Sequence, residues 1–134
     1  MKIGIPKEII SQEYRVSVNP ETAKMLLQSS HELYIQSGAG VDSGYSDDDY
    51  SALGCSIVDS AAEVFDKSEL IVKVKEPQKD EVEMIRENQI VYTYLHLAAA
   101  KELTEGLVKS KSINIAYETV TDDNGRLPLL APMS

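Results

Sequence analysis

Four polar residues with complementary chemistry each follow a short apolar run of the chain. Arg15 comes after residues 3–5, Lys75 after LIVKV, His96 after QIVYTYL and Glu118 after INIAY. An arginine fork matches a carboxylate with two hydrogen bonds, and a lysine adds a point charge or polarises a carbonyl. A histidine exchanges a proton near neutral pH. Together these side chains favour a site for a small 2-oxo acid or amino acid.

The apolar runs themselves are typical of strands in a parallel sheet. The run over residues 70–74 is β-branched and almost wholly apolar, as in a strand that is buried on both faces. Strands are predicted over residues 3–5, 32–36, 55–58, 70–74, 89–94 and 113–116. Helices are predicted between them, over residues 19–29, 46–53, 59–66, 80–87 and 98–110.

This alternation of strands and helices indicates βαβ units with right-handed crossovers. The predicted fold class is α/β, a mostly parallel sheet with helices on both faces, either flavodoxin-like or Rossmann-like. We expect residues 1–134 to form one domain, because the chain has no linker or internal repeat. Ligands of such sheets bind outside the carboxyl ends of the strands, so the four polar residues should line one crevice. Its candidate walls are Tyr94, Leu130 and Met133.

Each polar residue also has an ordinary structural interpretation. Arg15 can form an ion pair with Glu13 or Glu8. His96 can be a hydrogen-bonded core histidine, and Glu118 can cap or pair locally. The residue types alone leave these alternatives open.

The two lysines of KVKEP raise the question of an anion at the end of their strand. The ordinary expectation is that each aliphatic stem covers apolar surface while the ammonium stays in water. The strand-end position favours Lys75 as an anion ligand. Lys73 lies two residues earlier on the same face, and the sequence assigns it no role beyond structure and leaves that role undecided.

Composition narrows the class of partner and the compartment. The chain has 22 acidic and 13 basic side chains, a formal net charge of −9, which disfavours nucleic acid and anionic membrane surfaces. One cysteine, Cys55, excludes an internal disulfide and suits a reducing compartment, so we expect a cytoplasmic protein. The strand-like start is unlike a signal peptide, and no apolar run has transmembrane length. We find no cluster of metal ligands.

The Ser37-Gly38-Ala39-Gly40 loop needs a test as a dinucleotide-binding fingerprint. The third Gly or Ala of that fingerprint would fall on Ser43, and Gly44 comes one position too late. The acidic residues 47–49 would then repel a phosphate at the start of the next helix. We therefore predict a turn and no nicotinamide site on this chain.

Several segments of the chain resemble one enzyme family. They are MKIGIPKEI, EYRV, SGAG with the SDDDY that follows, KVKEP, TYLHLA, IAYETV and LPLLAPMS. The whole chain resembles the N-terminal catalytic domain of the alanine dehydrogenase and pyridine nucleotide transhydrogenase family. KVKEP, YLHLA and LLAPMS are the segments most specific for alanine dehydrogenases.

The resemblance implies a role for each matching residue. Arg15 and Lys75 would hold the carboxylate and carbonyl side of pyruvate or L-alanine, and His96 would be the acid/base or polarising partner. Met133 would press on the substrate pocket near the nicotinamide, and Ser134 would approach the cofactor. Family enzymes catalyse NAD-dependent oxidative deamination of L-alanine to pyruvate and ammonium, usually as homohexamers.

Length is where the chain departs from this family. Family members continue past APMS into a Rossmann domain with the glycine-rich fingerprint and a catalytic aspartate. We therefore expect the 134 residues to be a fragment that binds substrate but is inactive alone, with NAD held mainly by the absent domain. Two alternatives stay open: a free-standing domain that binds pyruvate or alanine, and the N-terminal part of a transhydrogenase subunit.

Overall fold

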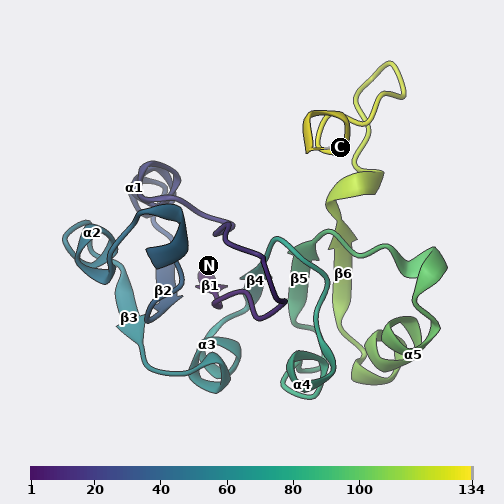
Figure 1. Cartoon of the computed structure of the whole chain (residues 1–134), viewed down its shortest axis with the longest axis horizontal. Coiled ribbons are helices and arrows are strands. Elements are labelled where there is room, and N and C mark those ends of the chain that lie inside the picture. The colour runs from purple at the N-terminus through teal and green to yellow at the C-terminus, as the bar shows by residue number, and fades with distance from the viewer. Residues whose placement is uncertain (134) are drawn as a thin grey trace.

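The computed structural model describes residues 1–133 and contains one sheet, whose strands lie between residues 2 and 116. Its strands are β1 (Lys2–Ile5), β2 (Glu32–Gln36), β3 (Ser56–Val58), β4 (Leu70–Val72), β5 (Ile90–Thr93) and β6 (Ile113–Ala116). Every neighbouring pair is parallel, in the order β3-β2-β1-β4-β5-β6 (Figure 1). This is the Rossmann order, and it decides between the two predicted topologies. The chain reverses direction across the sheet between β1 and β4, where such folds bind ligands.

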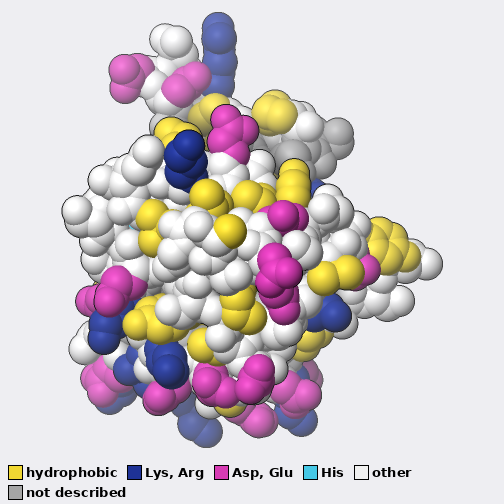
Figure 2. Space-filling view, turned by 90° about the vertical axis from the view of Figure 1, so that its left-hand side faces the viewer, with side chains coloured by type: hydrophobic (Ala, Val, Ile, Leu, Met, Phe, Trp, Pro, Cys, Tyr) yellow, Lys and Arg dark blue, Asp and Glu magenta, His cyan; other side chains and the backbone are white. Residues whose placement is uncertain are grey.

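Helices cover both faces of the sheet, as predicted. They are α1 (Pro20–Gln28), α2 (Asp47–Ser51), α3 (Ala61–Lys67), α4 (Lys79–Val82) and α5 (Lys101–Ser110). Short 3₁₀ turns are η1 (Val41–Ser43), η2 (Leu97–Ala99), η3 (Tyr117–Thr119) and η4 (Ala131–Met133). In Figure 1, α1 lies above the sheet and α3, α4 and α5 lie below it. Figure 2 shows charged side chains crowded over that lower surface.

Side-chain caps explain where three of the helices begin. The Asn19 side chain accepts a hydrogen bond from the Thr22 amide, directly before Pro20, as the sequence predicts. Ser46 and Asp49 form a reciprocal capping box at the start of α2. At α3, Ser60 is the capping residue.

Three local expectations were wrong in extent. The helix predicted over residues 80–87 ends at Val82, because the amides of Met84 and Ile85 donate to carbonyls three residues back, as in a 3₁₀ turn, and no longer four residues back. The strand predicted to reach residue 74 ends at Val72. The Asp123-Asn124-Gly125 stretch, which by sequence predicts a hairpin turn, forms a tight turn closed by the Asp122 amide donating to the Arg126 carbonyl at 3.0 Å, but without flanking strands.

The core divides between the two faces of the sheet. On one face, Ile3, Ile5, Leu33 and Ile35 pack with Ala23 of α1 and Tyr50 of α2. On the other face, Ile71 and Val91 pack with Val64, Phe65 and Leu107. Cys55 is buried in the first cluster, as expected of a small apolar residue.

Lys73 is buried in a triad of charges at the switch point, and the expectation that its ammonium stays in water was wrong. Its side chain is 1% exposed, and its Nζ lies 3.1 Å from Glu8 Oε1 and 3.0 Å from Glu81 Oε2. The contact with Glu81 is an ion pair rather than a well-directed hydrogen bond. Glu8 lies in the loop after β1 and Glu81 in α4, so the triad joins three elements. A buried ammonium persists only when it is paired in this way.

Glu8 also captures the backbone after β4. Its Oε2 accepts the Val74 amide at 3.1 Å, and its Oε1 accepts the Lys75 amide at 3.0 Å. One carboxylate therefore holds the loop after β1 to the loop after β4, with charge-assisted hydrogen bonds.

We predict that Lys73→Ala destabilises the fold by about 3–5 kcal/mol, because it leaves two buried carboxylates without their cation. Urea unfolding followed by circular dichroism measures the change. Lys79→Ala is the matched control, since Lys79 is exposed in the first turn of α4 and should change stability by less than about 0.5 kcal/mol. A loss below about 1 kcal/mol for Lys73→Ala would contradict the role of the triad.

We also predict a pH dependence from Glu81. Burial raises the pKa of the Glu81 carboxyl above its usual 4.5, against the opposing effect of the Lys73 ammonium. The folded chain therefore keeps this proton to higher pH than the unfolded chain, so the contribution of Glu81 to stability falls as pH rises above about 4.5. Glu81→Gln cannot titrate. The free energy of unfolding of the wild type minus that of Glu81→Gln should therefore fall between about pH 5 and about pH 7.5.

Urea unfolding at both pH values measures this difference. Glu83→Gln, at an exposed neighbouring position, should show a difference that stays constant with pH. A difference for Glu81→Gln that grows with pH would show that the carboxyl titrates in the opposite sense.

Candidate functional site

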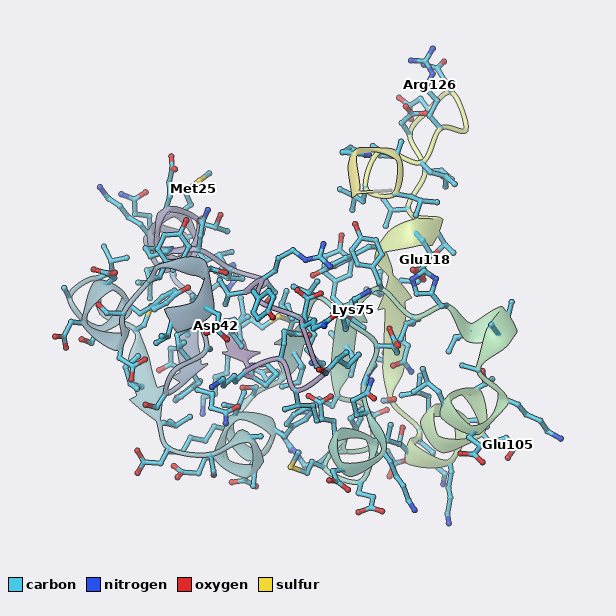
Figure 3. All side chains as sticks on the ribbon, in the orientation of Figure 1. Met25, Asp42, Lys75, Glu105, Glu118 and Arg126 are labelled. Carbon is cyan, nitrogen blue, oxygen red and sulfur yellow. The ribbon has the colours of Figure 1, made fainter. Side chains whose placement is uncertain are left out.

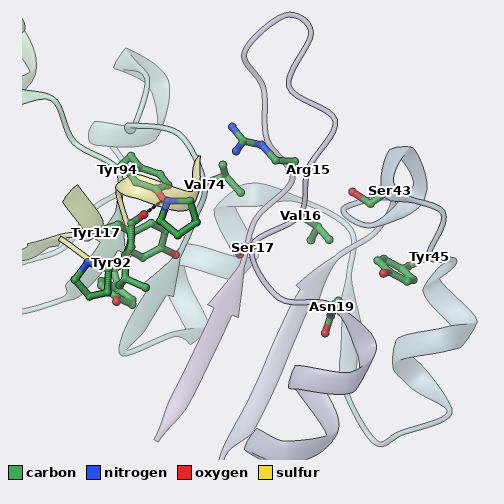
Figure 4. Close-up of a pocket in the computed structure, with 13 residues that line it drawn as sticks. Arg15, Val16, Ser17, Asn19, Ser43, Tyr45, Val74, Tyr92, Tyr94 and Tyr117 are labelled. Carbon is green, nitrogen blue, oxygen red and sulfur yellow. Dashed lines mark hydrogen bonds between the residues drawn. The ribbon is translucent and has the colours of Figure 1, made fainter. Parts of the chain in front are cut away.

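The loop between β1 and α1 carries Arg15 and is tied down on both sides. The Ser17 hydroxyl donates to the Val72 carbonyl at 2.8 Å, which joins the loop to the end of β4. The Ser43 hydroxyl donates to the Tyr14 carbonyl at 2.6 Å. Arg15 therefore projects from a held loop at the carboxyl edge of the sheet (Figure 4).

Arg15 forms the local ion pair with Glu13 that the sequence had left open. Its Nη2 donates to Glu13 Oε1 at 2.7 Å, and its Nε donates to Oε2 at 3.0 Å. The Glu13 side chain is 5% exposed and the Arg15 side chain 43%. The hydrogen bonds between them raise the pKa of Arg15 and lower the pKa of Glu13.

This ion pair uses only one edge of the guanidinium. An arginine carries five N–H groups, and Glu13 takes the edge formed by Nε and Nη2. No group among residues 1–133 accepts a hydrogen bond from Nη1. The edge formed by Nη1 and Nη2 can therefore still bind a carboxylate with two hydrogen bonds.

The structure brings Lys75 close to Arg15. Both line one shallow cleft of about 450 Å³ with residues 10–14. The positive charge of Lys75 also contributes to lowering the pKa of Glu13. The Thr93 hydroxyl holds the Lys75 carbonyl at 2.9 Å, and Glu8 holds its amide. Figure 3 shows Lys75 near the centre of the sheet edge.

A larger cleft of about 600 Å³ opens on the other side of Arg15. Its far wall is aromatic (Figure 4), because the ring of Tyr117 meets Tyr92 edge-on at 4.2 Å and Tyr94 edge-on at 4.7 Å. Burial raises the pKa of Tyr117 and of Tyr92, so both phenols are neutral at physiological pH. Cation on one side and neutral aromatic rings on the other suit a small carboxylate with an apolar tail.

The segment after β6 closes this cleft from above. Pro128, Leu129 and Pro132 line it, whereas Leu130, the predicted wall residue, is half-buried beside them. The Tyr94 hydroxyl donates to the Leu129 carbonyl and ties the segment down. The structure places Met133 at the end of η4, and Ser134 lies outside the described residues.

His96 lies beside the larger cleft rather than in its lining. Its ring stacks on Tyr94, with the centroids 6.4 Å apart and the planes at 17°. The residue is exposed, so the interpretation as a core histidine was wrong. Its backbone is left-handed, with a φ of 51°. Tyr94 thus connects His96 to the residues that line the cleft.

Glu118 does not point into the cleft. Its carboxylate accepts the Leu95 amide at 2.9 and 3.1 Å and the His96 amide at 3.3 Å. The local pairing left open by the sequence is what the structure shows. Glu118 therefore joins η3 to the chain after β5.

The Ser37–Gly40 loop is bound by a carboxylate of the chain itself. Gly38 turns the Ser37–Gly40 loop with a φ of 82°, but its amide already donates to Asp47 Oδ1 at 2.8 Å. The Ser37 hydroxyl donates to the other oxygen of Asp47 at 2.6 Å. The Gly38 amide and the Ser37 hydroxyl are therefore already paired and are not offered to a phosphate.

Residues 1–133 contain neither a candidate metal site nor a helix that could cross a membrane. No group of three or more His, Cys, Asp or Glu side chains there could hold a metal ion. None of the helices in this range has the length and apolar character needed to cross a membrane.

Fold and cleft define a doubly wound α/β domain with two cations at its topological switch point. The family model described as "Alanine dehydrogenase/PNT, N-terminal domain" matches residues 4–134. The chain therefore belongs to the family of alanine dehydrogenase/PNT N-terminal domains, as its sequence motifs had suggested.

Curated relatives and a solved structure support the same family assignment. Alanine dehydrogenases of Halomonas elongata and Mycolicibacterium smegmatis are each 48% identical over 134 residues, which is 100% of this chain and 36% of either relative. A solved structure named L-alanine dehydrogenase superposes with a TM-score of 0.96 at 45% identity, over 99% of this chain and 37% of that one. The chain thus spans about a third of the length of these relatives.

A more distant structural neighbour shares the fold alone. The transhydrogenase from Sinorhizobium meliloti has a TM-score of 0.83 at 24% identity, over 88% of this chain and 35% of that one.

Sequence reasoning named only Arg15 and Tyr94 among the residues that line the larger cleft, and it missed Tyr92, Tyr117 and Leu129 among others. Tyr92 had a usable signal, since it lies two positions before Tyr94 and so shares its face of the strand. Tyr117 and Leu129 follow the last strand, where no periodicity indicates which side chains turn inward.

We predict that Tyr94→Phe loosens the segment that covers the cleft, because it removes the hydrogen bond to the Leu129 carbonyl and leaves the ring in place. Loss of one such bond costs about 1 kcal/mol. Hydrogen exchange read by mass spectrometry should show faster exchange over residues 127–133. Tyr92→Phe is the matched control and should leave this segment unchanged. Equal exchange rates in both variants would show that the hydrogen bond from Tyr94 to Leu129 does not hold this segment.

Proposed function

We propose that this chain is the substrate-binding part of an NAD-dependent L-alanine dehydrogenase. The reaction is L-alanine, NAD⁺ and water going reversibly to pyruvate, ammonium, NADH and a proton. One observation carries the proposal: Arg15 and Lys75 lie in one cleft at the switch point, in a chain 48% identical to proteins named alanine dehydrogenase.

Arg15 and Lys75 bind the substrate in this proposal. The unpaired edge of the Arg15 guanidinium takes the substrate carboxylate, because its geometry matches two carboxylate oxygens. Lys75 contributes its charge to the carbonyl oxygen of pyruvate. The aromatic wall of Tyr92, Tyr94 and Tyr117 gives the methyl group an apolar surface.

His96 moves the proton in this proposal. The stack on Tyr94 holds the exposed imidazole beside the larger cleft. There it would give or take the proton at the substrate carbonyl oxygen, or polarise that carbonyl.

NAD would be the hydride carrier and would be held mainly by a part of the protein outside this chain. The carboxylate of Asp47 on the Gly38 amide supports this assignment, because it leaves no phosphate cradle at that loop. By resemblance, Met133 would lie near the nicotinamide and Ser134 near the cofactor. Residues 1–134 would then form the N-terminal catalytic domain, inactive alone, of a cytoplasmic enzyme that assembles as a homohexamer.

We predict that Arg15→Ala, Lys75→Ala and His96→Ala, each made in the protein encoded by the complete reading frame, lower kcat/KM for pyruvate. The two cation variants should lose about 100-fold, mainly through a higher KM, because they remove substrate positioning. His96→Ala should lose about 100-fold or more in kcat, because it removes the proton donor. The measurement is the rate of NADH oxidation with pyruvate and ammonium, followed by the loss of NADH absorbance.

Lys24→Ala and Lys109→Ala are the controls, since both side chains are exposed on helices and line neither of the two clefts at Arg15. The 134-residue chain assayed alone should show no NADH oxidation. Rates near those of the wild type in all three variants would refute the assigned site.

A further inference from the structure

Three glutamates share one relation to the three residues of the proposed site. Each accepts a hydrogen bond from the backbone amide of a site residue: Glu13 from Arg15 at 3.0 Å, Glu8 from Lys75 at 3.0 Å, and Glu118 from His96 at 3.3 Å. They come from different places in the sequence, namely the loop after β1 and the turn after β6.

We propose that Glu13 and Glu118 are positioning residues, which set the geometry of Arg15 and His96 without touching the substrate. Glu8 does the same for Lys75. This inference rests on the proposed function of the cleft, and it assigns the site its supporting carboxylates.

Glu13 fixes the arginine fork. It binds the amide, Nε and Nη2 of Arg15 at once, while its own side chain is 5% exposed. An unpaired arginine of this exposure would sample many rotamers, and it would lose that conformational entropy when a substrate binds. With Glu13 in place the fork is already oriented, and the Nη1 edge stays open.

Glu118 fixes the histidine through the backbone. His96 has a left-handed φ of 51° and ψ of 42°, a conformation that residues other than glycine rarely adopt. The carboxylate holds both amides that lead into this turn, those of Leu95 and His96. Without this carboxylate the backbone of His96 would relax to a conformation of lower energy, and the imidazole would leave its stack on Tyr94.

The three carboxylates are also unsuited to direct contact with the substrate. An unpaired carboxylate would repel the carboxylate of pyruvate or alanine. Each of the three instead points its oxygens at donors of the chain, Glu8 toward Lys73 as well. Their charges are thereby compensated, and the cations beside them remain the groups offered to an anion.

The test compares kinetics of the complete protein with Glu13→Gln and Glu118→Gln. If the glutamates act through their partners, each variant repeats the kinetic change of that partner in weaker form. Glu13→Gln should raise KM for pyruvate about 10-fold with kcat changed less than about twofold, like Arg15→Ala. Glu118→Gln should lower kcat about 10-fold with KM changed less than about twofold, like His96→Ala.

Double variants separate positioning from a general effect. Glu13→Gln added to Arg15→Ala, and Glu118→Gln added to His96→Ala, should cost less than about twofold more, because the positioned group is already gone. Glu21→Gln and Glu105→Gln, at exposed helix positions, are the controls and should leave both kinetic constants unchanged.

Glu13→Asp and Glu118→Asp keep the charge but shorten the reach, and they replace the Gln variants if either of those fails to fold. They should show the same split between KM and kcat. Equal losses of kcat in all variants together with a lower Tm, or additive losses in the double variants, would overturn the positioning role. Glutamate variants with wild-type kinetics beside impaired Arg15→Ala and His96→Ala would also overturn it and leave the proposed function intact. Wild-type kinetics in Arg15→Ala and His96→Ala would instead refute the proposed function.

Discussion

The buried charge triad of Glu8, Lys73 and Glu81 is the interaction on which the carboxyl edge of the sheet depends. Lys73 lies directly after β4, and its side chain is 1% exposed. Its ammonium therefore depends on carboxylates of the chain to compensate its charge. Its two carboxylates come from the loop after β1 and from α4. These ion pairs therefore hold three segments together where the strand order reverses. Glu8 also accepts hydrogen bonds from the amides of Val74 and Lys75, which fixes the chain after β4.

Two clefts meet at Arg15: the smaller one is also lined by Lys75, and the larger one has an aromatic wall. Arg15 is bound to Glu13 through one edge only, so the local ion pair and a role in anion binding are compatible. The rings of Tyr92, Tyr94 and Tyr117 interlock edge-on, an arrangement in which the positive rim of one ring meets the negative face of another. A carboxylate would meet the cations, and a methyl group would meet the rings.

Residues 1–133 form a six-stranded parallel sheet covered by helices, and the chain spans about a third of the length of its curated relatives. Six parallel strands in Rossmann order close their own core on both faces. The same order often accompanies dinucleotide binding, but here the Ser37–Gly40 loop follows β2 instead of the first strand, and Asp47 binds it. Fold and ligand are thus separable: the topology supplies an edge, and the side chains at that edge decide what it binds.

Local pattern was enough to determine the strands, the capped helices, the parallel α/β class and the strand-end positions of Arg15 and Lys75. Those features depend on residues within a few positions of one another, such as Asn19 with Thr22. Tertiary structure alone decided the strand order, the burial of Lys73 and the choice of Leu129 over Leu130 at the cleft. Glu8 and Lys73 are 65 positions apart, and no local periodicity encodes a contact at that separation, because it forms only when β1 and β4 pair.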